Sequence, residues 1–300
     1  MSVPQLFDLL ILTLIWAGIA AAWNLLAGFA GQFSLGHAAF IGIGAYAAAI
    51  AAMRYGVTPW AGMLGGMVLA GLLSLFIASI SLRLRGPFFT LLTIAFSEVV
   101  RLVALYAKPL TNGAEGIIIE LQPGFANLYF LEKWPFAVLT GLYAVGMYVL
   151  CVVIRQSRIG HWLLAIRDDE DAARSLGVPV YRARVIAAVV SAGCASFGGT
   201  LLAMYTQYID PDSTLSFLLS VEPALITIVG GLGHPSGPFL GAALIVPLER
   251  VLRSWFGGVL FGLHGLIFGV LLIAILLAAP DGILSVLARR RPRWGRPRHA

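Results

Sequence analysis

The chain has 300 residues and a formal net charge of +6, yet only 11% of its residues are charged and 59% are hydrophobic. Soluble domains carry about 25% charged residues, so this composition, with a mean hydropathy of +0.90, excludes an ordinary soluble protein. Apolar runs of about 20 residues, long enough to cross a bilayer as helices, recur along the sequence, whereas the alternating strands of an outer-membrane barrel do not. We therefore expect an all-α polytopic membrane protein.

Nine apolar segments predict about nine membrane-spanning helices. Because Gly and Pro interrupt some of these segments, the expected number ranges from eight to ten. The segments are residues 6–27, 35–53, 60–81, 87–107, 134–154, 182–205, 215–231, 236–254 and 259–279. We expect one transmembrane domain over residues 1–284 and a basic tail over residues 285–300. No cleavable signal peptide is expected, because no small-residue cleavage site follows the first apolar run.

Two glycine-rich segments, Gly28–His37 and Gly230–Pro238, interrupt the apolar pattern. Non-helical backbone at membrane depth persists only where protein or a water-filled cavity satisfies its polar groups. Transporters build their substrate passages from such broken helices. Because Asn24, Gln32 and His37 lie in or beside the first break, we expect them to face a hydrated translocation path.

Ionisable residues inside the predicted spans are further candidates for this path, because a charge at bilayer depth is expensive. Glu98 and Arg101 are three positions apart and so share one helix face. They form either a self-neutralising packing pair or part of the path or its gate. Glu222 precedes Pro223, which loosens a helix, and both a structural and a functional role are open for it. No set of these residues resembles a metal-binding shell or a proton relay.

A polar stretch of about thirty residues, 155–184, separates two apolar spans and is too long for a simple connection, which usually has about 4–6 residues. Residues 162–176 contain no Pro or Gly, and Trp162, Leu163, Ile166, Ala173 and Leu176 recur at helical spacing. We expect one helix lying along the membrane surface. It would expose Arg167, Asp168, Glu170 and Asp171 to the cytosol and end at Gly177 and Pro179. The alternative is a solvated connecting loop.

The distribution of basic residues predicts the orientation, because cytoplasmic loops are enriched in Lys and Arg. If the 155–184 loop is cytoplasmic, 14 basic residues lie inside: Arg83, Arg85, six in the loop and six in the tail. Only Arg54, Lys108, Lys133 and Arg253 then lie outside. The N-terminus is expected outside and the C-terminus in the cytoplasm, with the tail contacting anionic lipid head groups and not nucleic acid.

Catalytic and cofactor motifs are absent from the sequence. It contains no G-x-x-x-x-G-K-[ST] phosphate loop, no H-E-x-x-H zinc motif and no G-x-S-x-G nucleophile elbow. Cys151 and Cys194 lie in apolar segments without metal-binding spacing, which indicates packing residues. We expect a non-enzymatic chain that binds no metal or cofactor and has no ATPase motif of its own.

Several long motifs resemble one family of transporters. Residues Asp171–Gly177, D-A-A-x-x-x-G, are similar to the E-A-A-x-x-x-G loop of ABC importer permeases, with Asp in place of Glu. More specifically, the chain resembles LivM-type permeases of branched-chain amino-acid importers in SRIGHWLLAIRDDEDAARSLGV at 157–178, AWNLLAGFAGQFSLGHAAFIGIGAY at 22–46, LRLRGPFFTLLTIAFSEVVRL at 82–102, IDPDS at 209–213 and SVEPALITIVGGLG at 220–233. It departs from the family at His161, where Arg is usual, at His234, where Ser is usual, and in having nine spans where many relatives have ten.

The resemblance implies a permease of the type II-like ABC importer fold in the inner membrane. Its partners would be a second, homologous permease of the H type, two ATPase subunits that use the ATP, and a periplasmic or lipid-anchored amino-acid-binding protein. Whether the permeases pair as hetero- or homodimers is left open. The positions that it assigns to ATPase coupling are His161, Arg167, Asp168, Asp169, Glu170, Asp171, Ala172, Ala173 and Gly177.

Leucine, isoleucine or valine is the substrate that the resemblance implies, and related importers carry urea, short amides or aromatic acids. Two other classes are weighed against it. An ion-driven secondary transporter would work without an ATPase, and a channel would need a ring of like groups in a symmetric oligomer. Neither class predicts a helix in the 155–184 loop.

Overall fold

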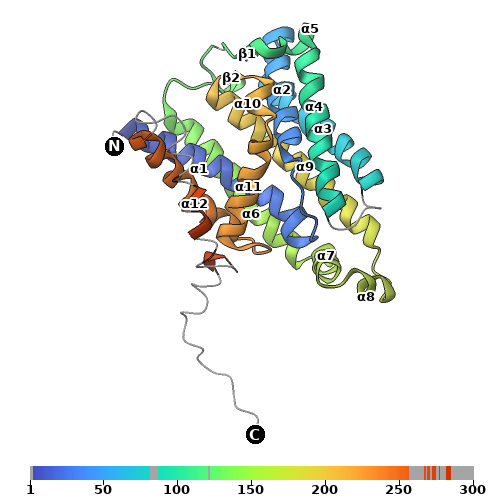
Figure 1. Ribbon diagram of the computed structural model, residues 1–300. Helices are drawn as coiled ribbons and strands as arrows, with labels where there is room; N and C mark the ends of the chain where they lie inside the picture. The colour runs from blue at the N-terminus through green and yellow to red at the C-terminus, as the bar shows by residue number, and fades with distance from the viewer. Residues whose placement is uncertain are drawn as a thin grey trace.

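The computed structural model describes residues 3–81, 87–120, 122–256 and, further on, 267, 269–270, 272–274, 277 and 282–284. Within these ranges the chain forms a bundle of long helices with short elements mostly at its ends (Figure 1). The long helices are α1 (Val3–Asn24), α2 (His37–Tyr55), α3 (Pro59–Ser81), α4 (Pro87–Tyr106), α6 (Lys133–Gln156), α7 (Arg158–Asp168), α9 (Val180–Thr206), α11 (Phe217–Gly231) and α12 (Gly237–Phe256). The short elements are η1 (Leu25–Phe29), α5 (Lys108–Thr111), η2 (Gly113–Glu115), β1 (Ile117–Ile118), η3 (Phe125–Asn127), α8 (Glu170–Ser175), β2 (Tyr208–Ile209) and α10 (Pro211–Thr214).

The predicted spans agree with this helix order as far as the chain is described. Seven segments of the described ranges are long and apolar enough to cross a membrane, the last of them being Pro211–Gly231. The eighth predicted span is the helix α12, which carries Glu249, Arg250 and Arg253 near its end. The all-α polytopic fold is confirmed, but the number of spans is not, because the predicted span 259–279 lies largely outside the described residues, as do Arg83, Arg85 and the tail 285–300.

The helix α1 is the most enclosed of the spans and organises the bundle. Its residues Ile11, Ile15 and Ile19 are fully buried, and it packs against α6, α9, α11 and α12. Small residues let neighbouring helices approach closely: a Cβ at Gly199 of α9 would overlap the backbone of Ile41 on α2. In lipid, such close backbone approach is a main source of helix–helix attraction.

The helix α4 differs from α1 in being largely uncovered. In its most apolar stretch 22% of the residues are buried, compared with 78% in α1. Large side chains including Leu91, Val99 and Val103 are exposed on it. The helix therefore presents a face that the other described residues do not cover.

The two ends of the bundle are built differently (Figure 1). At one end, β1 and β2 pair antiparallel, with Ile117 opposite Ile209 and Ile118 opposite Tyr208, beside α5 and α10. At the other end, α7 and α8 project beyond α6 and α9. The polar stretch 155–184 therefore forms a structured element, which excludes the alternative of an unstructured connecting loop.

Candidate functional site

The element that connects α6 to α9 consists of two helices, not the single helix expected over 162–176. The helix α7 ends at Asp168, and Asp169 is extended, with φ −156° and ψ 110°. The Asp169 carboxylate accepts hydrogen bonds from the backbone N–H groups of Asp171 (3.0 Å) and Ala172 (2.9 Å), so it starts α8 as an N-cap. Asp is a weak helix former and a strong N-cap, which explains the break.

The apolar side chains of this element divide between its inner and outer faces. Leu163 and Ile166 of α7 and Ala173 of α8 are buried, as their spacing predicts. Leu176, which shares this helical spacing in the sequence, is instead 84% exposed. The chain turns away from helical geometry at Gly177, with φ +81°, directly after it. An exposed leucine therefore lies where the element leaves α8.

The acidic residues of the element have unequal surroundings. Glu170 accepts a hydrogen bond from Arg174 within α8 (2.8 Å) and forms an ion pair with Arg184 (2.9 Å), which ties α8 to α9. The prediction that the Glu170 side chain is exposed is thus wrong, because only 18% of it is exposed beside these arginines. Asp168 is far more open, with 74% of its side chain exposed, and makes a long contact of 3.5 Å to Arg167.

His161 lies near the start of α7, where its ring Nδ1 is 2.8 Å from the carbonyl oxygen of Ser157. It lines a hollow of about 500 Å³ between α6, α7 and Pro235 of the α11–α12 turn. His161, one of the two residues that depart from the family pattern, therefore lies on the side of the projecting element that faces the second glycine-rich break.

Arg167 joins both glycine-rich breaks to α7. One of its guanidinium N–H groups donates to the carbonyl oxygen of Gly28 at 2.8 Å. The same guanidinium lies against Gly233 in the α11–α12 turn, where a Cβ would meet it. Asn24 links the breaks directly: its amide donates to the carbonyl of His234 (3.0 Å) and accepts from the N–H of Gly233 (2.9 Å). We call Asn24, Gly28, Arg167, Gly233 and His234 the inner cluster.

Gln32 and His37 are buried between helices of this chain. The His37 ring contacts Ser34 (3.3 Å) and Ser191 (2.9 Å), and the Ser191 hydroxyl donates to the carbonyl of Ala22 at 2.6 Å. Like Asn24, His37 thus connects separate helices. That Asn24, Gln32 and His37 face a translocation path remains a prediction.

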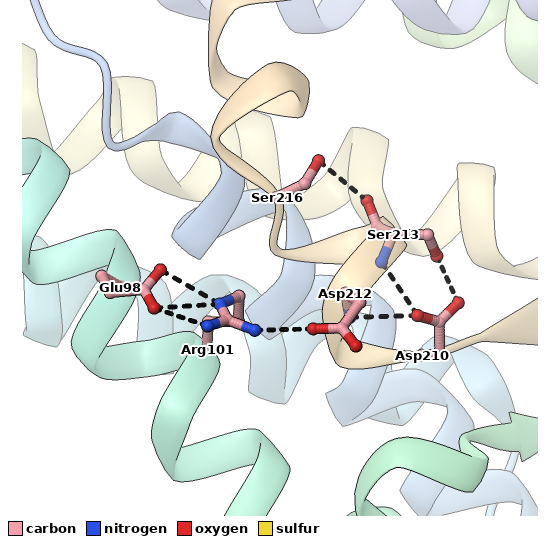
Figure 2. Close-up of polar contacts among 6 residues, drawn as sticks. All are labelled: Glu98, Arg101, Asp210, Asp212, Ser213 and Ser216. Atoms are coloured by element: carbon pink, nitrogen blue, oxygen red, sulfur yellow. Dashed lines mark hydrogen bonds and ion pairs between the residues drawn. The ribbon is translucent and has the colours of Figure 1, made fainter.

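A second polar group lies on the uncovered face of α4 (Figure 2). The Arg101 guanidinium donates to both carboxylate oxygens of Glu98 and, at 2.6 Å, to Asp212 of α10. Glu98 is 51% exposed and Asp212 68% exposed, although Glu98 and Arg101 lie within a helix apolar enough to span a membrane. We call Glu98, Arg101 and Asp212 the outer cluster.

The residues Asp210–Ser216 hold Asp212 in place. The Asp210 carboxylate accepts from the backbone N–H groups of Asp212 (3.0 Å) and Ser213 (2.9 Å), and Ser216 contacts the carbonyl of Ser213 (Figure 2). Sequence reasoning missed Asp210 and Asp212 as functional candidates. The IDPDS motif was the available signal, since an Asp before Pro is a typical helix start.

Glu222 lines a polar cavity of about 160 Å³ together with Glu249, Arg250 and Arg253 of α12. Nearby on α1, Asp8 pairs with Lys133 at 2.6 Å and accepts a hydrogen bond from Tyr205. Glu222 therefore lies among compensating charges. Neither Asp8 nor its partners were identified from the sequence.

In the described part of the chain no group of three or more His, Cys, Asp or Glu side chains could hold a metal ion. The donors instead pair with arginines, backbone groups and hydroxyls. The arrangement of the described residues is suited to positioning helices and presenting charged surfaces.

Comparisons with known proteins agree with this architecture. The family described as the permease component of branched-chain amino acid transport systems matches residues 5–276. The LivM permease proteins of the high-affinity branched-chain amino acid transport systems of Escherichia coli K12 and Salmonella typhimurium are 28% and 29% identical, and each match covers 93% of this chain and 70% of the relative. The LivH permease protein of E. coli K12 is 25% identical, with 94% of each chain covered. No solved structure matches the chain significantly. Since the family match spans most of the chain, the protein belongs to the permease components of branched-chain amino acid transport systems.

Proposed function

We propose that this permease component works in an ATP-driven importer of branched-chain amino acids and that α7 and α8 form the surface on which an ATPase subunit docks. The projecting α7–α8 element carries this proposal. Its buried side chains fix it to the bundle, while Leu176 and Asp168 point outward at the tip. Protein interfaces combine an apolar core with a polar rim, and an exposed leucine beside charged residues matches this composition. The relatives' names, which specify branched-chain amino acids, support the substrate class.

A second, homologous permease would pack against the uncovered face of α4. LivM and LivH proteins both match this chain, which supports a pair of homologous permeases. Charged residues inside membrane spans face the bundle interior or a water-filled cavity. Because the described part of the chain leaves Glu98 and Arg101 partly exposed, the partner permease or the path between the two would cover them. Glu222 is the further candidate for this path.

The proposed orientation places α7 and α8 in the cytoplasm and the β1–β2 end outside the inner membrane. The six arginines of the 155–184 loop support it. The amino-acid-binding protein would then deliver substrate at the β1–β2 end. The single transmembrane domain over 1–284 and the lipid-contacting tail over 285–300 complete the proposal.

Reconstitution in liposomes tests the function. We expect uptake of labelled leucine only when this chain is combined with its homologous permease, the two ATPases, the binding protein and ATP. The chain alone should move no substrate, since no ATPase motif is present in its sequence. Ion-driven uptake by the chain alone would overturn the proposal.

Docking is tested with two leucines that are similarly exposed at opposite ends of the bundle. Leu176 is 84% exposed and Leu131 is 80% exposed. We expect Leu176→Glu to lose co-purification of the ATPase, because truncating or charging a central apolar anchor removes much of a contact's affinity. Leu131→Glu should retain the ATPase. Equal retention in both variants would contradict docking at α8.

A further inference from the structure

We propose that Arg167 is a positioning residue that transmits movement of α7 to the broken ends of α1 and α11. This inference rests on the proposed docking of an ATPase at α7 and α8. It adds the route by which that docking would reach the membrane-spanning helices. The inner cluster carries the argument.

The first contact is made with the end of α1. This helix continues into the π-helical turn η1, Leu25–Phe29, and then the chain leaves helical geometry at Gly31, with φ +70°. Carbonyl groups in the last turn of a helix have no partner within the helix. The Arg167 guanidinium supplies one for the buried Gly28 carbonyl at 2.8 Å, and a cation is favoured at this negative end of the helix.

The second contact is made with the turn between α11 and α12. Gly233 adopts a left-handed conformation, with φ +77°, and approaches Arg167 so closely that a Cβ would meet its guanidinium. Gly31 lies against the aliphatic part of the same side chain, where a Cβ would be 3.0 Å from Arg167 Cγ. Two glycines from different breaks therefore lie against one arginine, whose side chain stays 35% exposed.

Arg167 belongs to α7 and moves with it, and the buried side chains of Leu163 and Ile166 couple this helix to the bundle. The helix packs against η1 and α9. Asn24 joins the ends of α1 and α11 to each other. A displacement of α7 would therefore shift both ends together, and α11 carries Glu222 toward its other end.

Arg167→Gln in the complete importer tests the inference, with substrate imported per ATP hydrolysed as the main measurement. The variant loses the positive charge and part of the guanidinium's set of N–H donors. Because hydrogen bonds to charged groups are strong, we expect the amount of substrate imported per ATP hydrolysed to fall at least about tenfold. ATPase co-purification and ATP hydrolysis are measured in parallel, because lost transmission lowers the import per ATP hydrolysed, whereas a loss of the ATPase itself would overturn the inference. Arg167→Lys, which keeps a charged donor, should recover part of the loss.

Arg182→Gln is the matched control, since Arg182 is an exposed arginine at the start of α9. We expect it to import at the wild-type ratio. Wild-type import by Arg167→Gln, or an equal fall in Arg182→Gln, would overturn the inference. It would also be overturned if neither Arg167 variant assembled, because the residue would then serve folding. Failure of the wild-type chain to bind an ATPase would refute the proposed function instead.

Discussion

Arg101 and Arg167 have different kinds of hydrogen-bond partner at the two ends of the molecule. In the outer cluster, Arg101 pairs with the exposed carboxylates of Glu98 and Asp212. In the inner cluster, Arg167 donates to the backbone of Gly28, and Asn24 bonds to the backbone of the α11–α12 turn. Side-chain pairs that are exposed can exchange partners, whereas buried backbone groups cannot.

The difference indicates what each cluster is suited to do. Exposed ion pairs contribute only about 0–1 kcal/mol, so a partner surface or a passing solute can replace them at small cost. Leaving a buried backbone group without a partner costs about 1–3 kcal/mol. The outer cluster therefore suits a surface that opens and closes, and the inner cluster suits a rigid junction between helices.

Asn24→Leu is expected to have the largest effect on stability. The variant leaves the buried N–H of Gly233 without its partner and removes the donor to the carbonyl of His234. We expect a loss of roughly 2–4 kcal/mol in the free energy of unfolding, measured by denaturation in detergent. Asn127→Leu is the control, because the Asn127 amide bonds to Gln122 at an exposed site. Equal losses of unfolding free energy in the two variants would show that the inner cluster is no more rigid than the surface, and would contradict the proposed difference.

Arg101→Gln should have a smaller effect on stability but a clear one on transport. We expect the free energy of unfolding to fall by about 1 kcal/mol or less, because the pairs are exposed. Leucine uptake should fall severalfold, since Glu98 and Asp212 would remain as uncompensated charges on the face of α4. Arg54→Gln, which removes exposed bonds to Leu110 and Asn112, is the matched control. Uptake that Arg101→Gln leaves intact would exclude the outer cluster from the path.

The sequence predicted local features well because they depend on neighbouring residues. The order of the spans, the two glycine-rich breaks and the burial of Leu163 and Ile166 all follow from apolar runs and helical spacing. The break at Asp169 was missed although it is also local. Its capping role competes with helix propagation, and the apolar spacing suggested one continuous helix.

The long-range contacts could not be predicted. Arg101 and Asp212 are 111 residues apart, and Asn24 and Gly233 are 209 apart. Which residues meet at such separations depends on how the helices pack, and periodicity within one helix carries no information about that. The sequence identified Glu98 and Arg101 as a pair, but it did not identify Asp212, the third residue of the outer cluster.

The proposed coupling requires the two ends of the bundle to lie on opposite sides of the membrane. This is tested by labelling Leu176→Cys and Leu131→Cys with a membrane-impermeant maleimide, with Cys151 and Cys194 replaced by Ala. We predict that Leu176→Cys reacts only when the reagent reaches the cytoplasmic face, and Leu131→Cys only when it is added outside. Labelling of both from one side, or of Leu176→Cys from outside, would contradict the account.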